Sequence, residues 1–105
     1  MGKAQKVDDH CIRHEGRYRT VGVYVVVVMD GGCPVEVQVS LVFLDKFESL
    51  NEISRVQDGF EKLAALANAT LQLGIQVSKL IKMLKQPPCE MSGIIGDALI
   101  AALGG

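Results

Sequence analysis

Residues 21–44 have the sequence VGVYVVVVMDGGCPVEVQVSLVFL, and this stretch indicates a β-hairpin. The first strand is predicted over Arg17–Met29, which is rich in β-branched side chains and contains no proline. Asp30-Gly31-Gly32 then supplies residues that tolerate the positive φ angles of a tight turn. The second strand is predicted over Val35–Leu44. The fold must therefore contain an antiparallel sheet.

The two predicted strands distribute their apolar side chains differently. The second strand alternates between an apolar and a polar face. Its apolar face comprises Val35, Val37, Val39, Leu41 and Phe43. The first strand is apolar on both faces, and a chain of this length has enough helical sequence to cover only one of them. We therefore expect the second apolar face of Val21–Met29 to form the interface of a homo-oligomer.

The rest of the chain has helical periodicity. Apolar residues recur at intervals of three and four from Asp45 to Leu73, and Ser49-Leu50-Asn51-Glu52 has the form of a capping box. Gly59 leaves open whether residues 49–73 form one helix or two. Two shorter helices are predicted over Val77–Lys85 and Ile94–Leu103. We expect an α+β fold, in which an antiparallel hairpin or larger sheet packs on helices in a small single domain that forms a symmetric oligomer.

Length, charge and cysteine content narrow the possible functions. The chain has 105 residues, which is enough for one core, and we expect a flexible or loosely packed arm over residues 1–16 before a domain over residues 17–105. The formal net charge of −1 argues against binding to duplex nucleic acid or a membrane surface. The longest apolar run is about half the ~20 residues of a membrane helix. Three cysteines and the absence of a signal peptide favour the cytoplasm.

Several segments resemble one known family when they are taken in order. They are Val23–Val28, then Gly32-Cys33-Pro34-Val35-Glu36-Val37, then the Leu-x-Leu-Gly-Ile pattern within Leu66–Leu84, and finally Gly96-Asp97-Ala98-Leu99. Between about Tyr18 and Leu103 the chain is similar to the TSCPD domain, which occurs in adenosylcobalamin-dependent ribonucleotide reductases and in small bacterial and viral proteins. The resemblance implies a TSCPD-like fold and a bacterial or phage protein related to nucleotide metabolism.

The motif that gives this family its name is degenerate here. Gly93-Ile94-Ile95-Gly96-Asp97 stands in the place of Thr-Ser-Cys-Pro-Asp, so the cysteine and the proline are missing. A metal or redox role of that cysteine therefore does not carry over. Asp97 is predicted in the first turn of the last helix, where a carboxylate faces unpaired backbone N–H groups.

Basic residues occur in two groups that suit a phosphorylated ligand. Arg17, Tyr18 and Arg19 lie together at the start of the first strand, and an arginine beside an aromatic ring suits a phosphate with a stacked base. Lys79 and Lys82 share the outward face of a predicted short helix. Each group also has a simpler interpretation, a solvated strand edge for the arginines and a solvated helix face for the lysines.

Residues for catalysis or metal binding are poorly represented. His10, Cys11 and His14 are weak zinc candidates, because Cys11-x-x-His14 has a spacing that zinc can use. The sequence contains no paired Cys-x-x-Cys motif and no nucleotide-binding glycine motif. We expect no enzymatic activity, no bound metal and no cofactor.

The sequence therefore predicts a non-enzymatic, homo-oligomeric module. It would self-associate through Val21–Met29 and bind or sequester a nucleotide or another small phosphorylated ligand at a subunit boundary. The alternative is a protein-interaction or regulatory subunit that docks on a ribonucleotide reductase or a related enzyme of nucleotide metabolism. A zinc-dependent structural domain is a third possibility.

Overall fold

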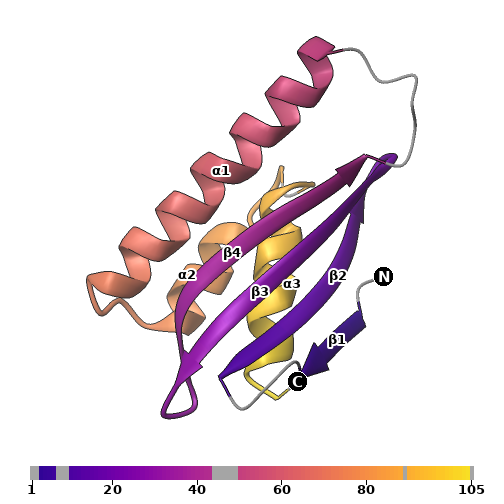
Figure 1. Ribbon diagram of the computed structural model, residues 1–105. Helices are drawn as coiled ribbons and strands as arrows, with labels where there is room; N and C mark the ends of the chain where they lie inside the picture. Colours follow the sequence, from indigo (N-terminus) through magenta and orange to yellow (C-terminus); the bar gives the residue numbers. More distant parts are fainter. Residues whose placement is uncertain (1–2, 7–9, 44–49, 89, 105) are drawn as a thin grey trace.

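The computed structural model describes residues 3–6, 10–43, 50–88 and 90–104 of the chain. Within them, four strands form one antiparallel sheet in the order β1-β2-β3-β4. The elements are β1 (Lys3–Lys6), β2 (Cys11–Tyr18), β3 (Val21–Asp30), β4 (Cys33–Phe43), α1 (Leu50–Gln72), α2 (Val77–Leu84) and α3 (Ser92–Ala102). All three helices lie on the same side of the sheet (Figure 1). The prediction of an α+β fold with an antiparallel sheet packed on helices is confirmed.

The predicted hairpin forms from β3 and β4. Its first strand begins at Val21 rather than at Arg17, because Arg17 and Tyr18 belong to β2 and a turn at residues 19–20 separates the two strands. The strands pair from Val21 opposite Phe43 to Asp30 opposite Cys33. Gly31 and Gly32 have φ angles of 60° and 81° in the connecting turn, a region that L-residues with a Cβ rarely occupy. The register shifts by one residue between Val28 and Met29. Val35 falls at this irregularity, and its side chain is 42% exposed rather than packed on the predicted apolar face.

The core lies between the helices and the inner face of β3. Alternate side chains of β3 are buried, namely Val21, Val23, Val25, Val27 and Met29. The largest fully buried side chains around them are Phe60 of α1, Leu80 of α2, Ile95 and Leu99 of α3, and Val37 of β4. On the other face of β3, Tyr24, Val26 and Val28 remain half-buried without a helix over them. β3 is therefore apolar on both faces, and the described helices cover one.

The described parts of the N-terminal segment are paired in the sheet, whereas a flexible or loosely packed arm was predicted over residues 1–16. Its described parts form β1 and β2, and β2 pairs with β3 from Cys11 opposite Val28 to Tyr18 opposite Val21. A Cβ atom added to Gly16 would lie 2.8 Å from Cγ2 of Ile94, so this glycine allows α3 to approach β2 closely. The sheet thus begins before residue 17. The polar composition of residues 11–18 did not indicate a buried strand, because every second side chain of β2 faces away from the helices.

Helix α1 is continuous, so residues 50–72 form one helix rather than two. A Cβ added to Gly59 would lie 2.6 Å from the methyl group of Met91, and this glycine leaves room for that side chain. The helix ends before Gly74, whose φ is 77°. The predicted cap at Ser49 lies outside the described residues. No described helix is long and apolar enough to cross a membrane.

The position of Asp97 corrects its predicted role. Helix α3 begins at Ser92, so Asp97 lies in the middle of the helix and not in its first turn. The Asp97 carboxylate accepts a hydrogen bond of 2.5 Å from Nζ of Lys85, the residue that follows α2. Both side chains are about half-exposed, at 41% and 50%, so this ion pair joins α2 to α3 at the surface.

A side-chain clasp attaches α1 to the free edge of β4. The Asn68 side chain accepts a hydrogen bond from the Val37 backbone N–H at 2.6 Å and donates one to the Val37 carbonyl at 3.0 Å. Both backbone groups lie at the edge of the sheet, where β4 has no neighbouring strand among the described residues. The carboxamide of Asn68 therefore replaces one residue of a neighbouring strand.

Replacing Asn68 with alanine should lower the free energy of unfolding by about 1–3 kcal/mol, because two partly buried backbone groups lose their partners. Urea denaturation of the wild type and Asn68→Ala measures the difference. Lys62→Ala, at an exposed position of the same helix, is the control and should change stability by less than about 0.5 kcal/mol. Equal stability of Asn68→Ala and the control would contradict the importance of the clasp.

Candidate functional site

A cavity of about 200 Å³ opens at one end of the sheet, and we name it the Tyr18 pocket. It is bordered by the β2–β3 turn, the end of β4 and the first turns of α1. Its lining residues are Tyr18, Arg19, Val21, Phe43, Glu52, Arg55, Val56 and Met91. The pocket therefore combines apolar and aromatic walls with three charged side chains.

The position of Tyr18 is set by two contacts of its ring. The ring meets Phe60 of α1 edge to face, with centroids 6.0 Å apart and planes at 83°. The Arg19 guanidinium lies 5.2 Å from the centroid of the Tyr18 ring, within the range of a cation–π contact. Arg19 has a φ of 54°, which is uncommon for a residue other than glycine. The turn thus holds Arg19 beside Tyr18 in a backbone conformation that costs free energy.

The charge of the pocket comes from two elements. Arg19 belongs to the β2–β3 turn, whereas Glu52 and Arg55 lie three residues apart on α1, a spacing that places both on one face of a helix. Arg55 was not predicted as a site residue, because only the tertiary fold brings it to Tyr18. Two guanidinium groups against one carboxylate give the pocket a net positive charge that suits an anion.

The other predicted ligand-binding residues lie elsewhere. Arg17 is paired with Gly22 and is exposed on the opposite face of the sheet from Tyr18, since successive strand residues face opposite ways. Lys79 and Lys82 are exposed on α2, which packs against α3 and α1. Neither lysine is among the described residues that line the Tyr18 pocket. Of the predicted set, the fold brings together Tyr18 and Arg19.

The zinc candidates are divided by strand geometry. Cys11 and His14 are three residues apart in β2 and so lie on opposite faces of the sheet. His10 precedes the strand at an exposed bend. Within residues 3–6, 10–43, 50–88 and 90–104, no three His, Cys, Asp or Glu side chains are grouped as metal ligands would be. The Cys11-x-x-His14 spacing is therefore not a chelating pair.

The face of the sheet away from the helices, which we name the open face, has an ordered arrangement of charge. Along its middle run the half-buried side chains of Tyr24, Val26 and Val28. On the β2 side, the Arg13 guanidinium lies 4.4 Å from the centroid of the Tyr24 ring and 3.8 Å from a Glu15 carboxylate oxygen. On the β4 side, Glu36 is exposed and accepts a hydrogen bond of 2.8 Å from Gln38. An apolar centre thus separates the arginine-bearing side, with Arg13, Arg17 and the single carboxylate of Glu15, from the acidic side, with Glu36.

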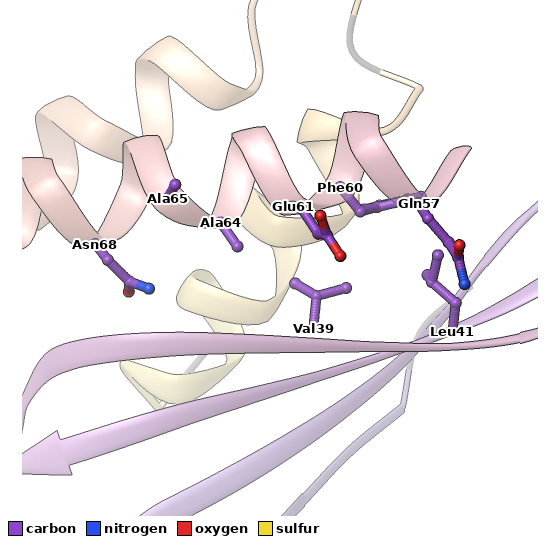
Figure 2. A pocket seen from close by; sticks show the side chains of 8 residues that line it. All are labelled: Val39, Leu41, Gln57, Phe60, Glu61, Ala64, Ala65 and Asn68. Atoms are coloured by element: carbon purple, nitrogen blue, oxygen red, sulfur yellow. The ribbon is translucent and has the colours of Figure 1, made fainter. Parts of the chain in front are cut away.

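A second cavity, the edge groove, has a volume of about 380 Å³ and lies between α1 and the free edge of β4. Figure 2 shows Val39 and Leu41 directed from the strand toward the helix, and Asn68 and Gln57 directed from the helix toward the strand. Its other lining residues are Phe60, Glu61, Ala64 and Ala65. Its position along the edge of β4 that pairs with no described strand distinguishes it from the Tyr18 pocket.

His14 is the buried titratable side chain of the inner face. It is 6% exposed, and its Nδ1 atom has no hydrogen-bond partner among the described residues. Burial lowers the pKa of His14 below its ordinary value of 6.5, and the nearby Asp97 carboxylate opposes this shift. The folded protein therefore favours a neutral imidazole at this position.

Acidification should weaken the fold through His14. Because its pKa is lower in the folded chain, the unfolded chain takes up the proton first as the pH falls through 6.5. The free energy of unfolding should therefore decrease between about pH 7.5 and about pH 5, and part of this decrease should disappear in His14→Leu. Urea denaturation across this range tests the effect, with exposed His10→Gln as the control. Identical pH profiles for the wild type and His14→Leu would contradict it.

No family model matches this chain, and neither a curated protein nor a solved structure does. The similarity to the TSCPD domain therefore stays a prediction from the residues. Function has to be inferred from the geometry of the Tyr18 pocket and of the surfaces around it.

Proposed function

We propose that this protein is a non-enzymatic, homo-oligomeric module that binds a nucleotide or a related phosphorylated ligand in the Tyr18 pocket. The observation that carries the proposal is the convergence of Tyr18, Arg19 and Arg55 on one cavity. A cytoplasmic location and a role near nucleotide metabolism follow from the predicted resemblance to the TSCPD domain.

The lining of the pocket matches the parts of a nucleotide. The guanidinium groups of Arg19 and Arg55 suit phosphate oxygens, which arginine binds through paired N–H donors. The aromatic side chains of Tyr18 and Phe43 offer apolar surface to a base. The carboxylate of Glu52 can accept a hydrogen bond from a ribose hydroxyl or a base amino group.

The size of the pocket is consistent with partial enclosure of such a ligand. Its volume of about 200 Å³ is below the roughly 300–1,000 Å³ of typical ligand sites. A neighbouring cavity of about 320 Å³ shares Tyr18 and Met91 with it and is bounded by Leu63, Pro88, Glu90 and Ser92. A nucleotide could therefore place one part in each of the two cavities that Tyr18 and Met91 border.

The proposed role is binding without catalysis. Sequestration of a ligand needs only affinity, which the two arginines and the aromatic walls can provide.

Self-association through the open face is the second part of the proposal. When two copies stack by a two-fold axis parallel to β3, the arginine-bearing side of one copy faces the acidic side of the other. The side chains of Tyr24, Val26 and Val28 in one copy then pack against the same side chains in the other copy. This apolar surface is thereby removed from contact with water. Charge and apolar surface are thus complementary in the same arrangement.

Substitutions in the Tyr18 pocket should weaken ligand binding. Arg19→Asn keeps a residue that tolerates positive φ, and Arg55→Gln keeps the length of the helix side chain. Each should weaken nucleotide binding about tenfold or more, because a hydrogen bond to a charged group contributes roughly 1.5–3 kcal/mol. Isothermal titration calorimetry against a panel of nucleotides measures the change.

Lys79→Gln and Lys82→Gln are matched controls, because they remove the same charge from exposed positions on α2. Their affinities should equal that of the wild type. An equal loss in the lysine variants, or no heat of binding with any nucleotide at millimolar concentration, would contradict the proposed site. The second result would favour the alternative of a docking subunit.

A charge placed in the centre of the open face should dissociate the oligomer. Val26→Lys would put an ammonium group between the two apolar centres, where its desolvation is unfavourable. Light scattering after size exclusion should show a multiple of 11.3 kDa for the wild type and a smaller particle for Val26→Lys. Leu66→Lys, at a 49% exposed position on α1, is the control and should leave the mass unchanged. A monomeric wild type would contradict this interface.

A further inference from the structure

We propose that the edge groove is a docking site for an extended segment of a partner protein, which adds a fifth strand to the sheet beside β4. This surface is separate from the Tyr18 pocket and from the open face. The proposal therefore stands independently of the ligand and of self-association.

The outer edge of β4 carries backbone N–H and C=O groups that pair with no described strand. The N–H and C=O groups of Val37 point out of the sheet edge, because both bond to the side chain of Asn68. In an antiparallel strand, alternate residues direct these groups to the same edge. The backbone groups of Val39 and Leu41 therefore point the same way, and no described strand pairs with them. Val39 and Leu41 therefore offer backbone N–H and C=O groups to an added strand. They lie next to Val37, whose own backbone groups are already bonded to Asn68.

The edge groove provides space for the side chains of a strand added beside β4. Helix α1 runs alongside β4, and Ala64 faces the strand across the groove (Figure 2). An added strand would lie about 4.8 Å from β4, in the plane of the sheet. Its inward side chains would then enter the space of about 380 Å³ beside Ala64, whose short side chain leaves room below the helix. The groove can thus accept side chains as well as backbone.

The charge of the edge groove indicates the chemistry of the partner. Glu61 is the one ionisable side chain among the described residues of the groove, and its carboxylate is directed into it (Figure 2). A lysine or arginine on the inward face of the added strand would neutralise this carboxylate, while its apolar neighbours would contact Val39 and Leu41. We therefore infer a segment in which apolar residues alternate with polar ones and one inward position is basic.

A second copy of β4 fits this groove poorly. The inward residues of β4 are Val37, Val39, Leu41 and Phe43, none of which is basic. Pairing of two copies would therefore bring apolar side chains to Glu61 and leave its charge without a counterion. The charge of the groove favours a different protein as the occupant.

Selection from a random peptide library on the immobilised full-length protein tests the inference. Enriched peptides should alternate between apolar and polar residues and carry a lysine or arginine. Their affinities are then compared between variants by fluorescence polarisation. Glu61→Lys should weaken binding about tenfold or more, and exchange of the basic peptide residue for glutamate should restore it. Asp58→Lys makes the same charge change at an exposed position of α1 that does not line the groove, and it should have no effect.

Leu41→Pro removes one outward N–H group and should also weaken binding, since proline at an edge position leaves the inner ladder intact. Circular dichroism checks its folding, and Glu61→Lys keeps the test decisive if Leu41→Pro does not fold. Arg19→Asn should bind the peptides like the wild type, which separates this site from the Tyr18 pocket. Failure to enrich peptides, or enriched peptides that bind Glu61→Lys as tightly as the wild type, would overturn the proposal.

Discussion

The burial of one face of β3 is the interaction on which the rest of the structure depends. Val23, Val25 and Val27 are fully buried beneath the helices, whereas Tyr24, Val26 and Val28 point to the other side of the same strand. All three helices lie on the inner face, so the outer face of the sheet keeps an apolar centre of Tyr24, Val26 and Val28. The outer edge of β4 pairs with no described strand. The surfaces proposed for self-association and for partner binding are thus direct consequences of how the core is formed.

The features that were predictable from the sequence are those that local patterns determine. The β-branched run of Val21–Met29, the glycine turn and the periodicity of α1 each depend on near neighbours in the chain, and each has the predicted structure. The strand β2 was missed because its alternating polar residues are on the open face and so resemble a solvated segment. Asp97 was misplaced because its helix begins two residues earlier than predicted, at Ser92 rather than Ile94.

The candidate site was only partly predictable for a related reason. Tyr18 and Arg19 are adjacent in sequence, so their proximity was evident, but Arg55 reaches them only through the packing of α1. Strand alternation removes Arg17 from this group, and α2 places Lys79 and Lys82 away from it. The clasp between Asn68 and Val37 joins residues 31 positions apart and has no local signal at all. Tertiary structure therefore decides which residues share a surface.

The chain has two tyrosines, and they report separately on the two parts of the proposed function. Tyr24 lies on the open face and Tyr18 lines the pocket. The most direct measurement is fluorine NMR of protein labelled with 3-fluorotyrosine, with the two resonances assigned by Tyr→Phe variants. We predict that raising the protein concentration shifts the Tyr24 resonance and that adding a nucleotide shifts the Tyr18 resonance. A Tyr24 resonance that is independent of concentration, together with a Tyr18 resonance that no nucleotide moves, would contradict the account.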